Sequence, residues 1–250
     1  MWAKGRFIHM AEFVTKAKEL GFTHIEANAS ISPQGLDELI KTSVPISSIH
    51  SPCPAVSSSK GTPVANLSLS SLDEGEREEA ASFAKKTIDL AATIGAKAVV
   101  LHMGEVPIDL NLDNELRYLY QHNLTQTKEY KQVKQQLSYQ RASKAPPHLE
   151  AARKSLQELS QYSQGKGIIL GLETRYYFHE IPNIDEMEIL LNALCHSEGA
   201  KRPKNLAQDK LRKESVGYWH DVGHAEVNQR LGFTPHEEWL SRFSHKMIGI

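Results

Sequence analysis

The chain has 250 residues, 40% of them apolar and 24% charged, as expected for a globular protein with a sizeable core in one large α/β domain or two small ones. A formal net charge of −1 argues against a global basic field that would hold a polyanion. There are only two cysteines and no Cys-x-x-Cys pair, which argues against a disulfide scaffold. The sequence has no 18-residue apolar run and no signal-peptide pattern, which argues against a membrane span and secretion. Together these features predict a reduced, cytoplasmic setting.

The first half of the chain alternates helical and strand patterns. Apolar residues recur at helical spacing over 11–20, and Gly21 ends this predicted helix. A second helix is predicted at 73–94, because acidic residues begin it and Gly95 ends it. The same half is predicted to contain strands at 22–28, 45–50 and 96–102, a helix at 33–41 and a polar loop at 57–71.

The second half keeps this alternation after an interruption. The stretch at about 107–147 is rich in Gln, Lys, Tyr and Leu and is mostly compatible with helix. It is followed by predicted helices at 149–163, 183–195 and 235–243, strands at 167–173, 216–221 and 246–250, and a charged, Lys-rich loop at 197–215.

Strands that alternate with helices predict right-handed βαβ units and a parallel sheet. No Gly-x-Gly-x-x-Gly follows the first strand, which argues against a dinucleotide-binding open sheet and favours a (β/α)₈ TIM barrel. Six strands cannot close such a barrel. We therefore predict a single partial barrel domain over 1–250, lacking most of strand one, the end of strand seven and strand eight. The helical insertion at about 107–147 is expected to form a lid or a dimer contact.

Ionisable residues stand at the ends of five predicted strands. Side chains alternate along a strand, and this counting turns the end residues toward the barrel interior. The carboxyl ends of barrel strands meet at one mouth, where active sites lie. The five residues are Glu26, His50, His102, Glu173 and Asp221. Grouped acids and imidazoles repel or desolvate one another unless a cation or a substrate organises them, so their convergence predicts a metal or catalytic site.

Two features carry most of this prediction. Glu173 closes an otherwise apolar strand, where an unpaired carboxylate is costly. Asp221 and His224 are three apart, and we expect Gly223 between them to permit a sharp turn that swings His224 back beside the carboxylate. A carboxylate and an imidazole suit a divalent metal ion, here manganese, magnesium, cobalt or zinc.

Each residue also has a simpler interpretation. Taken alone, Glu26 is more typical of a hydrogen-bonded interior carboxylate, and His50 and His102 of loop or strand-end histidines. Cys53 lies between two prolines without a basic cluster, as a small loop residue would. Trp219 and the run at 176–178 fit packing at the mouth or an apolar wall for a sugar. The other histidines are interpreted as surface or structural: His9, His24, His122, His148, His179, His196, His220, His236 and His245.

Five motifs resemble the xylose isomerase-like barrel superfamily: Ile25-Glu26, Ser48-Ile-His-Ser-Pro52, Val100-Leu-His-Met-Gly104, Leu172-Glu-Thr-Arg175 and His220-Asp-Val-Gly-His224. That superfamily contains sugar and sugar-phosphate isomerases and epimerases, and also endonuclease IV-like nucleases. In the isomerase branch the resemblance implies metal binding by Glu173 and Asp221, with His224 near the substrate. A His at the end of strand seven and a Glu on strand eight complete that shell; Gly249 faces inward, so the expected His would fall at position 251.

The first functional hypothesis is therefore a metal-dependent sugar or sugar-phosphate isomerase or epimerase, a small-molecule enzyme compatible with a homo-oligomer. Carboxylates would move a proton next to a metal-polarised carbonyl. We assign catalysis to Glu173, His224 and His102, metal binding to Glu173, Asp221, His50 and His102, and substrate binding to Glu26, His224, Trp219 and Arg175.

Two alternatives stay open. In the nuclease branch, the resemblance implies that His50, His102, Glu173, Asp221 and His224 belong to a three-zinc phosphodiesterase site acting on abasic DNA. Nucleic acid is not the expected partner, because the basic residues lie in the insertion and at 200–213, away from the loops after the second and third barrel strands. The other alternative is a barrel fragment without turnover, since part of the isomerase shell is not in the sequence.

Overall fold

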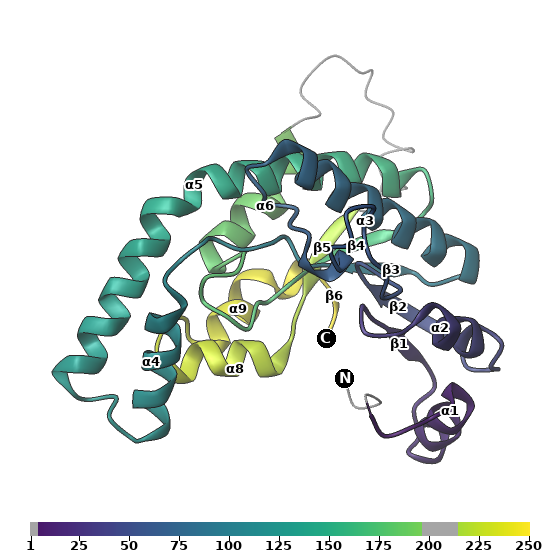
Figure 1. Ribbon diagram of the computed structural model, residues 1–250, viewed down its shortest axis with the longest axis horizontal. Helices are drawn as coiled ribbons and strands as arrows, with labels where there is room; N and C mark the ends of the chain where they lie inside the picture. Colours follow the sequence, from purple (N-terminus) through teal and green to yellow (C-terminus); the bar gives the residue numbers. More distant parts are fainter. Residues whose placement is uncertain (1–4, 197–214) are drawn as a thin grey trace.

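A computed structural model describes residues 5–196 and 215–250. Its core is one parallel sheet whose six strands follow one another in chain order, as Figure 1 shows. The strands are β1 (Ile25–Ala27), β2 (Ile46–His50), β3 (Ala98–Leu101), β4 (Ile169–Glu173), β5 (Val216–Trp219) and β6 (Met247–Gly249). All six agree with the predicted strands, which extend a few residues beyond them at one or both ends.

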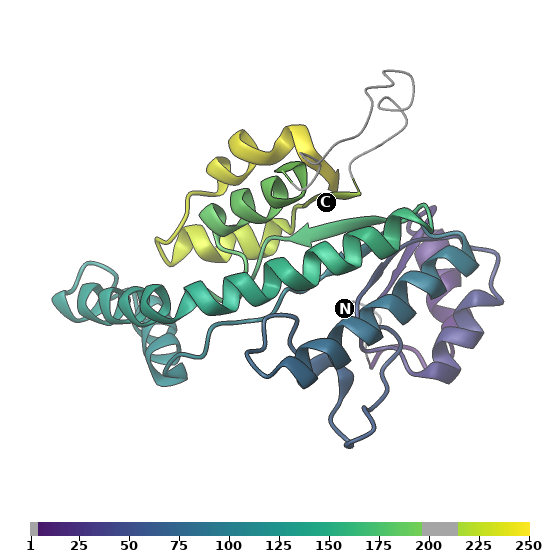
Figure 2. The same cartoon turned by 90° about the horizontal axis from the view of Figure 1, so that it is seen from above.

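Helices cover the outside of this sheet (Figures 1 and 2). They are α1 (Met10–Glu19), α2 (Pro33–Ile40), α3 (Glu74–Ile94), α4 (Leu110–Gln121), α5 (Lys128–Gln164), α6 (Ile184–His196), α8 (Val222–Arg230) and α9 (His236–Phe243), with short 3₁₀ turns at Val64–Asn66 and Ser244–Lys246. In the described part of the chain, none of the helices combines the length and apolar character needed to cross a bilayer.

The central strands β3, β4 and β5 are largely buried, whereas β6 at the edge of the sheet is exposed or half-buried. Every residue of β3 is buried, and Leu170 and Leu172 of β4 are fully enclosed in the core. Helix α3 begins where the Asp73 side chain accepts a hydrogen bond from Glu76 N and ends at Gly95, which has the left-handed φ of 80°. These local signals agree with the predicted boundaries of that helix.

The insertion differs from the prediction at its end. The structure has one 37-residue helix, α5, that runs through Pro146 and Pro147, where we expected one helical stretch to end and another to begin. Each proline removes a helix hydrogen bond, which bends a helix without necessarily ending it, and α5 curves in Figure 1. Helices α4 and α5 pack through their own apolar cluster and form a hairpin that extends away from the sheet in Figure 2.

The segment after β5 also differs. We expected a loop after Asp221, but helix α8 begins there with Asp221 as its N-cap. The carboxylate Oδ1 accepts a hydrogen bond from His224 N at 2.8 Å. The predicted sharp turn at Gly223 is therefore wrong, because the first turn of a helix brings a residue and its third successor together without a special glycine conformation.

The barrel is open. Among residues 5–196 and 215–250, β1 pairs only with β2 and β6 only with β5, so the six strands do not close. This confirms the predicted partial barrel. The predicted Lys-rich loop lies, except for its last residue, outside the described residues, and the single-domain division and the role of the insertion stay predictions.

Candidate metal centre and active site

The strand ends bring the predicted acids and imidazoles to one rim of the sheet. Glu26 lies in β1, His50 ends β2, His102 follows β3 and Glu173 ends β4. Asp221 follows β5 by two residues. Strand alternation and parallel pairing account for this arrangement, because equivalent ends of parallel strands lie side by side.

Glu173 is at the centre of the rim and is 3% exposed. Its Oε1 lies 3.1 Å from His50 Nε2, and its Oε2 lies 3.0 Å from His102 Nε2. Arg175 Nη1 donates to the same Oε2 at 2.5 Å. Burial opposes ionisation, but these three partners hold the pKa of Glu173 well below its usual range, so the carboxylate is ionised.

His50 lies between two carboxylates. Its Nδ1 is 2.8 Å from Glu26 Oε1, while Ser48 Oγ donates to Glu26 Oε2 at 2.6 Å. Burial acts to lower the pKa of His50, but its bonds to Glu173 and Glu26 outweigh burial and raise it to about 9. Without a metal ion, His50 is therefore an imidazolium that donates from both ring nitrogens.

Asp221 and His224 form the other side of the rim. Asp221 Oδ1 caps α8, which leaves Oδ2 3.8 Å from His224 Nε2. His224 Nδ1 lies 2.8 Å from the carbonyl oxygen of Thr174. A carbonyl oxygen only accepts, so Nδ1 carries the proton and Nε2 presents a lone pair on the side of Asp221.

These donors fit a divalent metal ion. In one group, ligand atoms of His50, His102 and Glu173 all lie within 4.8 Å of one another; in a second, those of Glu173, Asp221 and His224 do. Glu173 belongs to both groups. Carboxylate oxygens with imidazole nitrogens suit zinc, manganese or cobalt, and the backbone bond of His224 is the kind of outer contact that orients a metal ligand.

Two residues assigned to substrate binding lie at the same rim in different settings. Arg175 is 7% exposed and uses its terminal nitrogens on Glu173 and on Glu180. The Trp219 ring covers Gly171 and Gly249, where a Cβ would meet ring atoms at 3.1 and 2.2 Å. The two glycines therefore make room for the indole inside the sheet.

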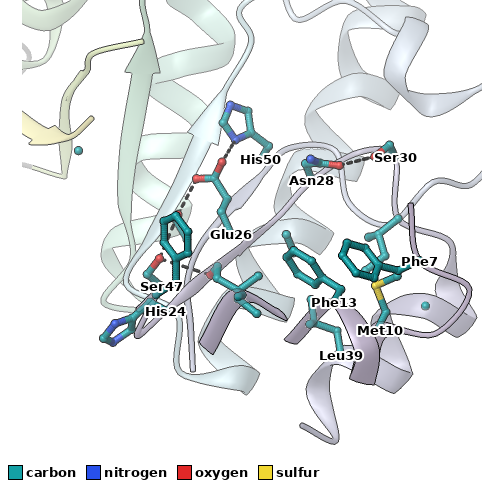
Figure 3. Close-up of a pocket in the computed structure, with 18 of the residues that line it drawn as sticks. Phe7, Met10, Phe13, His24, Glu26, Asn28, Ser30, Leu39, Ser47 and His50 are labelled. Atoms are coloured by element: carbon teal, nitrogen blue, oxygen red, sulfur yellow. Dashed lines mark hydrogen bonds and ion pairs between the residues drawn. The ribbon is translucent and has the colours of Figure 1, made fainter. Parts of the chain in front are cut away.

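A cavity of about 1280 Å³ opens beside these groups and is larger than a typical small-ligand pocket. Its lining includes Glu26, His50, Glu173, Trp219 and Asp221. Figure 3 shows Glu26 facing His50, while apolar side chains gather on another part of the wall; among them are Phe7, Met10 and Phe13.

The helical hairpin reaches the rim through aromatic contacts. The Arg117 guanidinium of α4 lies 4.7 Å from the ring centroids of both Tyr176 and Tyr177. Tyr176 in turn meets the His224 ring edge to face at 5.5 Å. The aromatic run at 176–178 therefore packs between the hairpin and the site, as predicted for mouth packing.

Sequence reasoning missed a relay behind the rim. Tyr218 Oη lies 2.7 Å from Thr174 Oγ1 and 2.6 Å from His220 Nδ1, and His220 Nε2 lies 3.0 Å from His236 Nε2. His220 is 1% exposed, and burial lowers its pKa. Strand alternation places Tyr218 and His220 together on the face away from Trp219 and could have revealed the pair.

Two further supports had no recognisable sequence signal. Glu180 binds Arg175, and Asn228 Nδ2 donates to the carbonyl oxygen of Arg175 at 2.7 Å and to that of His224 at 2.9 Å. Glu180 lies five residues after Arg175 and Asn228 four residues after His224, but neither belongs to one of the motifs. Cys53 is buried, which raises the pKa of its thiol to about 12, as expected for a structural residue.

Comparison with known proteins gives one family match. The model of a family described as xylose isomerase-like TIM barrel matches residues 14–198. No curated protein matches the chain significantly in sequence.

Solved structures with the same fold include three sugar-enzyme relatives. The 3-keto-D-glucoside 4-epimerase YcjR from E. coli is 12% identical, with 97% of this chain and 73% of that chain covered and a TM-score of 0.58. A xylose isomerase domain protein from Planctomyces limnophilus is 13% identical (95% and 67% covered, TM-score 0.51). An L-ribulose 3-epimerase is 10% identical (88% and 57% covered, TM-score 0.51). At these identities the likeness shows the fold.

Proposed function

This chain belongs to the xylose isomerase-like TIM barrel family, and from its rim of acids and imidazoles we propose that it is a divalent-metal-dependent sugar or sugar-phosphate isomerase or epimerase. The observation that carries the proposal is the group formed by Glu173, Asp221 and His224, whose ligand atoms lie within 4.8 Å of one another. Sugar epimerases among the structures of the same fold support the substrate class.

Glu173, Asp221 and His224 would hold the metal ion, with His50 and His102 on the other side of Glu173. Asp221 Oδ1 caps the helix and His224 Nδ1 bonds the Thr174 carbonyl oxygen, so the metal ion would bind the other atoms, Asp221 Oδ2 and His224 Nε2. A bound divalent cation supplies Lewis acidity that polarises the carbonyl and hydroxyl oxygens of an open-chain sugar.

The proton chemistry falls to the residues around the carboxylate. His102 is the most exposed imidazole of its group, with 45% of its side chain accessible, so it can reach a substrate oxygen. Glu173 is the remaining candidate to take or return a proton at the carbon next to the carbonyl, because the metal ion and the Thr174 carbonyl would engage both ring nitrogens of His224. Trp219 would offer an apolar face to the sugar, and Arg175 would keep Glu173 ionised from a buried position.

The group of His50, His102 and Glu173 favours a second candidate function. Two histidines beside a shared carboxylate would also suit clustered zinc ions that activate water for phosphodiester cleavage. This zinc phosphodiesterase would act on abasic DNA, and it predicts more than one zinc per chain.

Metal analysis of the purified protein, with assays on both substrate classes, separates the candidates. We expect one tightly bound divalent ion and solvent hydrogen exchange at the carbon next to the carbonyl of a ketose, followed by NMR in D₂O. Glu173→Gln should abolish both, whereas the exposed Glu150→Gln should not. Several zinc ions with cleavage of abasic DNA would reject the isomerase proposal, and exchange that survives Glu173→Gln would reject the assigned site.

A further inference from the structure

Glu26 was expected to bind substrate, but its carboxylate is engaged by the protein. Its Oε2 accepts a hydrogen bond from Ser48 Oγ at 2.6 Å, and its Oε1 lies 2.8 Å from His50 Nδ1. A glutamate carboxylate is ionised at neutral pH. An ionised carboxylate only accepts, so Nδ1 of His50 donates.

The sheet builds this contact. Glu26 of β1 is paired in register with Ser48 of β2, and His50 follows Ser48 by two residues on the same face of the strand. The Ser48 hydroxyl therefore holds one carboxylate oxygen while the other faces the imidazole. Figure 3 shows the Glu26 side chain reaching from β1 to the His50 ring.

The bond at Nδ1 decides what His50 can offer the centre of the rim. With Nδ1 kept protonated, Nε2 is the nitrogen left to face Glu173, 3.1 Å away. The His102 ring meets the His50 ring edge to face at 5.3 Å and restrains it from another side. His224 is arranged in the same way, because its Nδ1–H donates a hydrogen bond to the Thr174 carbonyl oxygen and its Nε2 lies on the side of Asp221.

We propose that Glu26 is a positioning residue, held by Ser48, that fixes the orientation and the Nδ1–H tautomer of His50 so that its Nε2 is presented to a cation beside Glu173. The role rests on the proposed metal centre. Carboxylates that bind the outer nitrogen of a metal-bound histidine raise the basicity of that ligand and lower the entropy lost on binding.

Cobalt(II) alone is the probe, because its visible absorption reports both affinity and coordination. Glu26→Ala removes the acceptor and should weaken cobalt binding roughly 10- to 100-fold, the usual effect of losing such an outer partner. Glu26→Gln keeps an acceptor oxygen for Nδ1–H and should recover much of the affinity. Glu38→Ala is the matched control, because Glu38 lines the same cavity but its carboxylate accepts a hydrogen bond from Met10 N instead of facing His50.

Proton–nitrogen NMR of the metal-free protein tests the geometry without reference to metal or activity. We expect a protonated, slowly exchanging Nδ1 for His50, identified by its loss in His50→Gln, and we expect it to exchange fast in Glu26→Ala. Melting temperatures check that each variant is folded.

Cobalt affinity unchanged in a folded Glu26→Ala, or an equal loss in Glu38→Ala, would overturn the proposal. So would an unprotonated Nδ1 of His50 in the unaltered chain. A chain that binds no cobalt but shows the protonated, Glu26-dependent Nδ1 would instead remove the metal-dependent function and keep the positioning contact.

Discussion

Replacing His50 by Asn tests whether one imidazolium stabilises the metal-free rim. His50 is 16% exposed in its side chain and has a pKa of about 9 in the folded protein, against 6.5 without its partners. At about 1.36 kcal/mol per pKa unit, this difference corresponds to about 3 kcal/mol of unfolding free energy.

The sign follows from which state binds the proton more tightly. Because the folded pKa is raised, the stabilisation is fully present below pH 6.5 and is lost as the pH rises to about 9. Glu26 and Glu173 have lowered pKa values, so their contribution is present above about 4.5 and is lost as the pH falls. The metal-free protein should therefore be most stable between these limits, at about pH 4.5 to 6.5.

Urea unfolding with EDTA, at pH values from 5 to 10, measures this dependence. We expect the unfolding free energy of the unaltered chain to fall by about 3 kcal/mol between pH 6.5 and 9, and His50→Asn to show a much flatter profile. The exposed His122→Asn variant serves as the control and should keep the fall. Parallel profiles for the unaltered chain and His50→Asn would show that His50 is not clamped between the two carboxylates.

Three other outcomes can be measured. Zinc binding at pH 7 should displace the proton from Nε2 of His50, so its calorimetric enthalpy should vary with the ionisation enthalpy of the buffer; a constant enthalpy would contradict this. In the unaltered chain the buried Glu186 carboxylate accepts hydrogen bonds of 2.7 and 2.6 Å from Arg141. Arg141→Met leaves this carboxylate buried without its partner and should lower the free energy of urea unfolding by about 3–5 kcal/mol. A decrease below about 1 kcal/mol would contradict the buried ion pair. Gly249→Ala would place a Cβ within 2.2 Å of the Trp219 ring. We expect it to lower the free energy of unfolding by about 1–3 kcal/mol and to alter the near-ultraviolet circular dichroism. An unchanged spectrum would contradict the packing of the indole against Gly249.

Local patterns predicted the strands well. Apolar runs ending in Glu173 and His102 marked β4 and β3, and alternation placed the end residues on the inner face. Convergence of the rim followed from topology alone, since parallel strands end side by side. This is the part of a fold that pattern and spacing determine.

Other features depend on contacts that a linear pattern does not contain. Pro146 and Pro147 signalled a helix end, but α5 continues because its buried face packs against α3 and α6. Asp221 was predicted as a metal ligand, and its second role as the cap of α8 was missed because the apolar spacing after it is weak. The bond between Glu26 and His50 needs the register of two strands, which the sequence does not specify.

The two roles of Asp221 couple local order to ligand occupancy. Fraying of the first turn of α8 would release His224 N and carry the His224 ring away from its carbonyl partner, and so would separate two of the three proposed ligands at once. Conversely, a bound metal ion would stabilise the first turn of α8 and slow amide hydrogen exchange along that helix. Metal binding at this centre and local unfolding of the segment from Asp221 to His224 are thus thermodynamically linked, so that each kilocalorie gained by binding is added to the free energy of opening that segment.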